Sequence, residues 1–474
     1  MSIYKNLLMN LPEVRNPIKK GTLKDRLIWT FGMLVLFLFL ASIPLYGVSG
    51  EQADYFKTLE LLLGAKIGTL LTLGIGPIVT SSIVLQLLKG AGMLKFDMQT
   101  EEGKFLYGGT HKLLTFAFVI VQSIVYVMFG AVANDPAVAN SYTLLVIQLA
   151  LGGILVVYMD EVVKKWGFGS GVSIFIAAGI GGAVFVQLFS PFNAVGDVSF
   201  TDADSPPVGK FWQMFIFLQA GNFLSLGTEV LAPILVTVGL LFLIVFFQAV
   251  NVEIPLSFGR VKGQGFRWPL NFFYAGVIPV ILISALSANL QLWARLLQSA
   301  AENAGSSGFT RFLSEHVLGQ YSGETAISGL VHWISPVRII DNLGSVFTFD
   351  VLFNVITYTI FLVIGSTLFA YFWVQTAGMD SRSQAQSILR SGLQIPGFRK
   401  DVRIIEKVLD RYIVPLTFLG GIGIGLLASF ADLFSALTSG TGILLLVMII
   451  YQFYQQLAKE SMEDFSLLRK FMRR

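Results

Sequence analysis

Long apolar runs follow one another along almost the whole chain, separated by short polar segments. A helix that crosses the hydrocarbon core of a membrane needs about 20 predominantly apolar residues. Ten runs approach that length, and the predicted spans are 27–46, 67–88, 113–133, 142–159, 172–192, 230–250, 270–294, 351–377, 413–431 and 436–457. Two further apolar stretches, 55–63 and 211–226, are too short or too interrupted to count as spans.

The basic residues orient these spans. Ten spans place both termini on one side, and most of the 33 lysine and arginine residues then fall on that side. Because loops rich in these residues stay in the cytosol, we expect a multi-pass protein of the plasma membrane with both termini cytosolic. The apolar run after residue 26 is longer than the roughly 7–15 residues of a signal-peptide core, so it is interpreted as a retained span.

Composition agrees with this topology and narrows the chemistry. The chain is 54% hydrophobic and 13% charged, whereas soluble domains carry about 25% charged residues. It has no cysteine, which excludes disulfides, thiolate nucleophiles and thiolate metal sites. None of the ten predicted spans contains Asp, Glu, Lys, Arg or His. Proton relays need ionisable groups at membrane depth, so we do not expect the transported substrate to be bound by charge pairing within the membrane. Ion sites formed by backbone groups at broken helices remain an alternative.

The spans divide into two halves that look like a repeat. Five spans in each half require the halves to be inverted relative to each other. "GIGPIV" (74–79) in the second span resembles "VIPVIL" (277–282) in the seventh, and "GSGVSIFI" (169–176) resembles "SGTGILLL" (439–446). The alternative is that glycine and proline are simply common in membrane helices. The predicted divisions are a cytosolic N-terminal segment (1–26), an N-terminal half (27–192), an external connection (193–229), a C-terminal half (230–458) and a cytosolic tail (459–474).

Symmetry brings the second, fifth, seventh and tenth spans together at the interface of the halves. Aliphatic residues at suitable spacings in these spans would then form a collar, with Ile75 and Val79 sharing one helix face. Such a collar blocks ions by dewetting and fits loosely around a substrate that is apolar or that combines apolar and polar groups. Taken singly, each of these residues is more simply a core or lipid-facing aliphatic.

Uncharged polar residues form a second feature of the spans. The second span contains Thr80, Ser81, Ser82 and Gln86, the third contains Gln122, and the seventh contains Asn289. Hydrogen bonds between membrane helices contribute about 0.6–2 kcal/mol each, which suits a seam that opens. Static helix packing explains the same residues equally well.

Three segments outside the spans complete the pattern. The stretch 55–64 has the length of a re-entrant helix that plugs a cavity from outside, with a surface amphipathic helix as the alternative. The cytosolic loops 251–269 and 377–412 are basic and would attract phosphate of lipid headgroups or RNA. No P-loop, HExxH or GxSxG occurs, and His111, His316 and His332 lie outside the predicted spans. We therefore expect no enzyme, no metal site and no cofactor.

Four motifs in these places resemble a known family. "IGTLLTLGIGPIVTSSIVLQLL" (67–88), "GFGSGVSIFIAAG" (167–179), "VEIPLSFGRVKG" (252–263) and "GTGILLLV" (440–447) are similar to the SecY protein-conducting channel family, in its archaeal and eukaryotic branch. The resemblance implies an all-α polytopic membrane protein, with ten transmembrane helices in two inverted five-helix halves around a central pore and a short plug helix. By motif position, the pore ring would be Ile75, Val79, Val172, Ile176, Ile281 and Leu445.

The resemblance also assigns a lateral gate between the second and seventh spans, with Thr80, Gln122 and Asn289 as its polar residues. Some archaeal relatives carry an acidic residue at the position of Gln122, where the amide here keeps polarity without charge. The plug would lie within 55–64 and present Tyr55, Phe56, Leu59, Leu62 and Leu63. Ribosome docking would fall to Arg260, Lys262, Arg399 and Lys400 in the two basic loops.

The function implied is that of the central pore subunit of a protein translocation channel. It would pass secretory polypeptides across the membrane and release transmembrane segments into lipid through the lateral gate. Its implied partners are two small single-span subunits, the ribosome, signal sequences, nascent polypeptides and membrane lipid. The rival hypothesis is a secondary transporter with inverted repeats, which predicts a midplane site for a small solute; the lack of ionisable residues in the spans counts against it. A structural membrane scaffold is a third class, and it would not need an aliphatic collar aligned across both halves.

Overall fold

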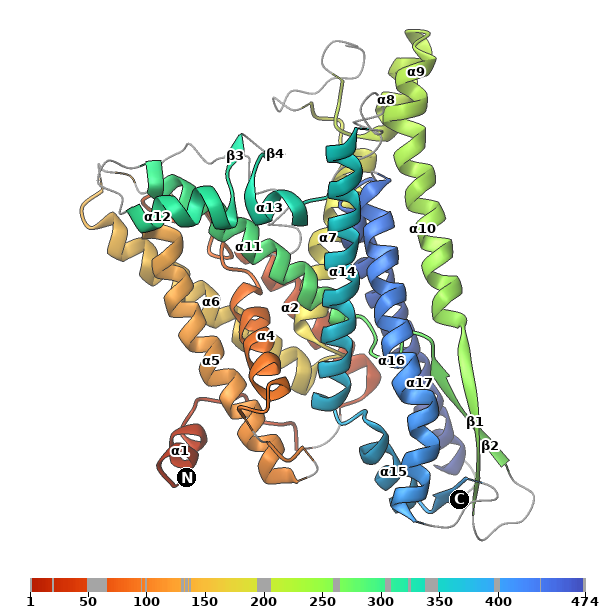
Figure 1. Ribbon diagram of the computed structural model, residues 1–474. Helices are drawn as coiled ribbons and strands as arrows, with labels where there is room; N and C mark the ends of the chain where they lie inside the picture. The colour runs from red at the N-terminus through yellow and green to blue at the C-terminus, as the bar shows by residue number, and fades with distance from the viewer. Residues whose placement is uncertain are drawn as a thin grey trace.

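Long apolar helices form the body of the molecule, some upright and others oblique in the view of Figure 1, and most of the shorter elements lie at their ends. The computed structural model describes residues 2–18, 21–48, 66–94, 96–98, 100–128, 132, 135, 138–193, 206–258, 265–302, 308–322, 325–336, 348–395 and 401–471. The N-terminal half contains α1 (Ser2–Met9), α2 (Leu23–Leu40), α4 (Gly76–Gly90), α5 (Glu101–Met128), α6 (Ser141–Trp166) and α7 (Gly171–Phe189).

The connection and the C-terminal half contain the remaining helices. The connection is itself helical where it is described, which the sequence pattern did not predict as a span or as a helix. These elements are α8 (Lys210–Gln219), α9 (Phe223–Ser225), the π-helical η2 (Leu226–Leu231), α10 (Ala232–Ala249), α11 (Ile278–Glu302), α12 (Gly308–Phe312), the π-helical η3 (Leu313–Leu318), α13 (Gly329–Ile334), α14 (Phe349–Thr376), α15 (Ser381–Arg390), α16 (Val402–Leu433) and α17 (Gly440–Phe471).

Among the described residues, eight helical segments are long and apolar enough to cross a membrane. They correspond to the third to tenth predicted spans. The helices of the first two spans fall outside that set for identifiable reasons: α2 carries Lys24, Asp25 and Arg26 in its first turn, and α4 has only 15 residues. At 1.5 Å per residue α4 reaches about 22 Å, so the turns before it supply the rest of the second span.

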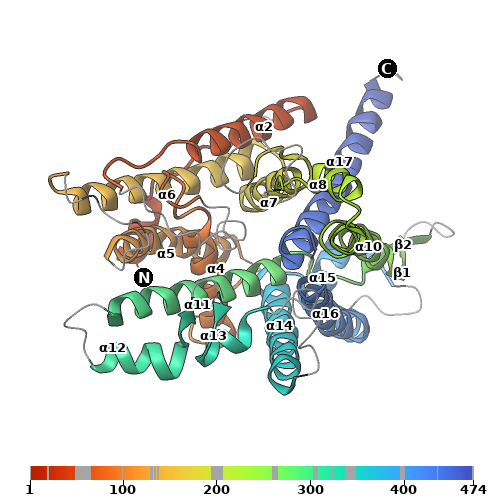
Figure 2. The ribbon, with the colours of Figure 1, turned by 90° about the horizontal axis from the view of Figure 1, so that it is seen from above.

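Seen from above, the two halves lie side by side (Figure 2). The helices α2, α4, α5, α6 and α7 occupy one side, and α10, α11, α14, α16 and α17 occupy the other. At one end of the seam α4 and α5 face α11, and further along it α7 meets α17. The main hydrophobic core spans both halves along this seam.

The second and seventh spans begin their helices in the same way. Gly74 has φ +49° and lies three residues before Pro77, while Gly276 has φ +68° and lies three residues before Pro279. Glycine adopts positive φ at no steric cost, and proline is favoured in the first helical turn, where its missing N–H would have no intrahelical partner. The two segments therefore share a turn followed by a helix start, as the proposed internal repeat requires.

Strands from the two basic loops pair at one end of the molecule (Figure 1). Strand β1 (Asn251–Phe258) pairs antiparallel with β2 (Gly265–Asn271), so the first loop is a hairpin. The short strand β5 (Leu393–Gln394) from the second loop pairs with the end of β1. A separate hydrophobic cluster joins this sheet to α15 and the start of α16. A second, two-stranded sheet of β3 (Tyr321–Ser322) and β4 (Thr325–Ala326) lies between η3 and α13.

Candidate functional site

The turns before α4 account for the glycines and proline in the second predicted span. Residues 67–75 are not helical, and the helix begins at Gly76. The hydroxyl of Thr69 donates a 2.6 Å hydrogen bond to the carbonyl of Lys66, which stabilises the turn locally. Non-helical backbone persists at membrane depth only where protein buries it, and Leu71 in this segment is 1% exposed.

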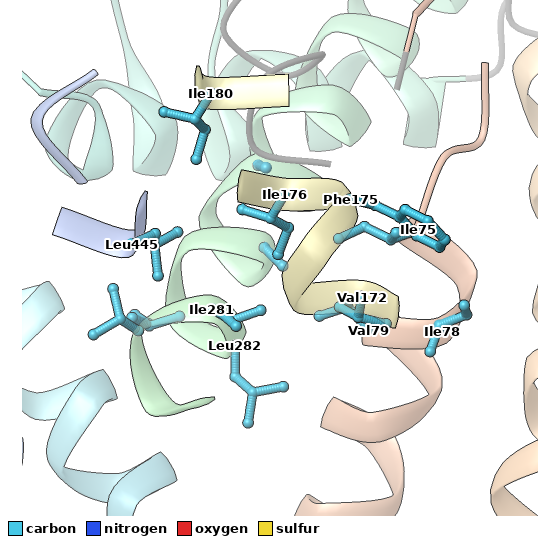
Figure 3. Packing of buried hydrophobic residues seen from close by; sticks show 14 of the residues in the cluster. Ile75, Ile78, Val79, Val172, Phe175, Ile176, Ile180, Ile281, Leu282 and Leu445 are labelled. Carbon is cyan, nitrogen blue, oxygen red and sulfur yellow. The ribbon is translucent and has the colours of Figure 1, made fainter. Parts of the chain in front are cut away.

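The six residues predicted to form the pore ring lie together in the main hydrophobic core. They are Ile75, Val79, Val172, Ile176, Ile281 and Leu445. In Figure 3 the α7 residues Val172 and Ile176 lie between those of α4 and those of α11 and α17. All six are buried, from 0% exposure at Ile75 to 9% at Val172. The ring presents only aliphatic carbon, so it offers neither charge nor hydrogen-bonding group to an ion.

Phe175 belongs to the same cluster, although the sequence analysis did not single it out. Its ring stacks on that of Phe37 of α2, with centroids 4.3 Å apart and an interplanar angle of 5°. The side chain is fully buried beside Ile75 (Figure 3). Nothing in an aliphatic run marks one phenylalanine as a neighbour of the ring, because the contact depends on α2 packing against α7.

A cavity of about 540 Å³ adjoins the ring and reaches the seam between α4 and α11. Ring residues Val79, Val172 and Ile281 line one part of it. Its other lining residues include polar ones: Ser82, Gln86, His111, Lys164, Ser170, Ser173, Gln452 and Gln456. The buried Oε1 of Gln86 accepts no hydrogen bond from any described residue. The cavity thus combines apolar walls with hydrogen-bonding groups, which suits a ligand of mixed chemistry.

The three predicted gate residues converge on one hydroxyl group. Both Gln122 of α5 and Asn289 of α11 donate side-chain amide hydrogen bonds to Oγ1 of Thr80, at 3.2 Å and 3.3 Å. The Thr80 hydroxyl itself donates to the carbonyl of Gly76 at 2.8 Å. A second bond from Asn289 to the carbonyl of Ala285, at 2.8 Å, orients the amide. The bond from Asn289 to Thr80 crosses the seam between the halves.

A second polar group joins α4 to α5 and was not recognised in the sequence. His111 was placed outside the spans, but α5 begins at Glu101 and includes it. Its Nε2 lies 2.7 Å from Oγ of Ser82 and 3.2 Å from Oγ of Ser81. The Ser81 hydroxyl is also 2.7 Å from Oγ1 of Thr115. These bonds stay within the N-terminal half, so they hold α4 against α5.

Close contacts at the C-terminal end of α4 also cross the seam. Gly90 lies directly against the ring of Phe372 of α14, with no room for a Cβ atom. Beside it, Nζ of Lys89 donates a 3.4 Å hydrogen bond to the carbonyl of Gln375. The seam between α4 and the C-terminal half therefore has two sets of contacts, the hydrogen bond from Asn289 to Thr80 and the close packing of Gly90 against Phe372.

The remaining predicted sites are only partly covered by the described residues. The plug residues Tyr55, Phe56, Leu59, Leu62 and Leu63 lie outside them, as do Arg260, Lys262, Arg399 and Lys400 of the docking loops. Around those loops the structure does place exposed basic residues, namely Arg267, Arg382, Arg390, Arg403, Lys407 and Arg411. In the part of the chain that is described, no group of three or more His, Cys, Asp or Glu residues is placed to hold a metal ion.

Comparison with known proteins agrees with this architecture. The SecY family profile matches residues 69–454. The protein translocase subunit SecY of Methanothermobacter thermautotrophicus is 38% identical over 474 residues, covering 99% of this chain and 98% of that protein.

Two solved structures resemble the fold over most of its length. One, described as the structure of a protein conducting channel, gives a TM-score of 0.79 at 35% identity and covers 96% of both chains. The other, Sec61 in the canine ribosome-channel complex from the endoplasmic reticulum, gives 0.77 at 33% identity with the same coverage.

Proposed function

This chain belongs to the SecY family of protein translocase subunits, and we propose that it is the central pore-forming subunit of a protein-conducting channel. The observation that carries the proposal is the aliphatic ring beside a cavity of mixed polarity, at the seam of the two halves. An unsatisfied backbone group in hydrocarbon costs several kcal/mol. A pore through the ring spares a secreted segment that cost.

The ring acts as a seal that yields to a polypeptide. Its six side chains carry no charge or hydrogen-bonding atom, so the narrow passage dewets and resists ions when no client is present. Aliphatic side chains adapt to varied client residues without binding any of them tightly. A secondary transporter would instead need a specific polar site for a small solute, and the ring provides no such site.

The seam between α4 and α11 acts as the lateral gate. The bond from Asn289 to Thr80 is weak enough to break when an apolar segment arrives. An opened seam lets signal sequences and transmembrane segments partition into lipid. Residues 55–64 act as the plug on the outer side of the ring in this proposal.

The cytosolic sheet and its flanking helices form the docking surface for the ribosome. Arg403, Lys407 and Arg411 follow one another at four-residue intervals along the exposed start of α16, so they line one face of the helix. Arg260, Lys262, Arg399 and Lys400 of the two basic loops add positive charge in this proposal, which suits phosphate-rich RNA. The canine Sec61 relative belongs to a ribosome-channel complex. Two small single-span subunits complete the heterotrimer in the plasma membrane, with both termini cytosolic.

Site-directed crosslinking tests the pore assignment. The chain has no cysteine, so a single cysteine at Ile75 or Leu445 is unique. A ribosome-bound secretory chain with one cysteine, stalled in transit, is expected to form a disulfide with either position. The matched control is Leu241→Cys on α10, whose side chain is 43% exposed on an apolar helix. Crosslinks from Leu241 but from neither ring position would overturn the proposal.

A further inference from the structure

Two buried carboxylates lie next to the pore helices but form no part of the ring. Asp160 near the end of α6 is 5% exposed, and Asp432 near the end of α16 is 6% exposed. Each falls one residue beyond the predicted limit of its span, so the predicted spans themselves contain no acidic residue. A buried carboxylate needs hydrogen-bond donors or a cation to be stable, so the partners of Asp160 and Asp432 indicate what each residue does.

Asp160 holds the first turn of α7. Its Oδ1 accepts a 3.0 Å hydrogen bond from the backbone N–H of Val172. The N-cap residue Ser170 makes no side-chain capping bond, so a carboxylate from another helix supplies the cap. A Cβ at Gly171 would lie 2.6 Å from Cα of Asp160. Glycine therefore permits the close approach, and the negative charge complements the helix dipole. The other oxygen, Oδ2, forms a 2.6 Å ion pair with Lys164.

Asp432 does the same for α17. Its Oδ1 accepts the backbone N–H of Thr441 at 2.9 Å and the Thr441 hydroxyl at 3.3 Å. The first residue of the helix is again a glycine, Gly440, where a Cβ would overlap the backbone of Ala431. Its Oδ2 accepts a 2.6 Å hydrogen bond from the hydroxyl of Tyr358. The two halves thus repeat one arrangement of carboxylate, glycine and capped helix.

This arrangement corrects the alignment suggested by the sequence motifs. Matching glycine–hydroxyl–glycine in both motifs would pair Gly171 with Gly442. The helix starts and the carboxylate contacts pair Gly171 with Gly440 instead, and Val172 with Thr441. In this register Ile176 and Leu445 are equivalent, since each follows the capped N–H by four residues.

The caps therefore act close to the ring. Four residues of helix rise about 6 Å, so Ile176 and Leu445 each lie little more than one turn beyond a fixed point. The two helices run antiparallel in contact: Gly442 packs beside Ile180, and Gly169 packs beside Phe453. Each carboxylate fixes one helix along its axis, and the two helices approach the ring from opposite directions.

We propose that Asp160 and Asp432 are paired positioning residues that set the axial height of Ile176 and Leu445 and thereby the ion seal of the resting channel. The proposal rests on the pore ring of the proposed function. Neither carboxylate contacts the client. Each acts through the helix that it caps, and its essential property is a hydrogen-bond acceptor at the first turn.

Resting ion conductance of the reconstituted channel complex in planar bilayers tests this role. Asp160→Ala and Asp432→Ala should raise the conductance severalfold, because the capped turn loses its acceptor. Asp160→Asn and Asp432→Asn keep an acceptor oxygen and should stay near the wild-type conductance.

A second variant covers the case in which the alanine proteins fail to accumulate. Gly171→Ala keeps both carboxylates but displaces α7 from Asp160, and should leak severalfold, whereas Gly182→Ala on the same helix meets no atom within 4 Å and should not. Wild-type conductance in Gly171→Ala and in any alanine variant that accumulates would overturn the positioning role. If the positioning role fails in this way, the Ile281→Asn variant tells whether the ring assignment fails with it. A leak through Ile281→Asn in the same bilayers would support the ring as the ion seal. Wild-type conductance of Ile281→Asn would overturn the ring assignment as well.

Discussion

The side-chain amide of Asn289 on α11 donates a 3.3 Å hydrogen bond to the hydroxyl oxygen of Thr80 on α4. These residues are 209 positions apart in the chain, and their bond joins the two halves at the seam. Gln122 donates to the same oxygen from within the N-terminal half. The Thr80 hydroxyl therefore accepts one hydrogen bond across the seam, from α11, and one from α5 within its own half.

Thr80→Val should loosen this seam. The change keeps the shape of the side chain but removes the acceptor of both amides, so the closed gate should lose about 1 kcal/mol. A channel with this change should translocate precursors with weakened signal sequences more efficiently than wild type. Translocation of a precursor series with progressively shortened apolar cores measures the effect.

Thr417→Val is the matched control for the loss of a hydroxyl in a membrane helix. The Thr417 hydroxyl is buried and donates only within its own helix, to the carbonyl of Ile413 at 2.7 Å. This variant should treat the precursor series as wild type does. Equal behaviour of Thr80→Val and wild type would contradict a gating role for the hydroxyl.

Gly90→Ala should push α4 and α14 apart at the Gly90 end of the proposed gate. The added methyl group would overlap the ring of Phe372 across the seam, and overpacking of this kind typically costs about 1–3 kcal/mol. Because the strain is relieved when the halves part, the variant should favour the open gate and relax the requirement for a strong signal sequence.

A compensating change makes this prediction specific. Phe372→Leu in the Gly90→Ala background provides room for the methyl group and should restore wild-type selectivity between strong and weak signals. If the double variant is as permissive as Gly90→Ala alone, the steric contact is not the cause.

Ile281→Asn should raise the resting ion conductance of the channel severalfold. An amide in the ring binds water and lowers the dewetting barrier that excludes ions. Planar-bilayer recordings of the channel complex without a client measure the leak. Ile244→Asn is the control: Ile244 is fully buried, whereas Ile281 is 5% exposed, and it lies on α10, which contributes no residue to the predicted ring. Any leak it shows would therefore report general destabilisation instead.

Gly152→Ala should destabilise the protein without altering the gate residues. A Cβ at Gly152 of α6 would overlap the carbonyl oxygen of Leu70 in the turns before α4. Backbone cannot move aside as a flexible side chain does, so we expect a loss of about 1–3 kcal/mol. The apparent melting temperature of the purified complex measures it.

Gly239→Ala on α10 is the control for that substitution. A Cβ at Gly239 meets no atom within 4 Å, and alanine is favoured over glycine in a helix by about 1 kcal/mol. The melting temperature should therefore hold or rise. A similar fall in both variants would indicate that helix flexibility, and not contact with the Leu70 turn, governs stability.

The sequence by itself determined the membrane class and located the eight described helices that are long and apolar enough to cross a membrane. These follow from local properties, because an apolar run of sufficient length has few alternatives to a membrane helix. The turn and helix start at Gly74–Pro77 could be recognised in the sequence as an interruption of the second span, because glycine and proline change the conformation of their own backbone. The motifs also identified Thr80, Gln122 and Asn289, which the fold brings within hydrogen-bonding distance.

The tertiary structure alone decided which helix ends meet and at what height. Asp160 and Asp432 looked like residues just beyond two spans, and His111 looked like one just before another. Each becomes a partner of a pore or gate helix only because distant segments pack against it. Hydropathy describes how strongly a residue prefers lipid to water. It does not indicate which hydrogen-bond partner that residue will have in the folded protein. In the proposed positioning role, Asp160 and Asp432 set the register of α7 and α17, because glycines in the first turns let each carboxylate come close.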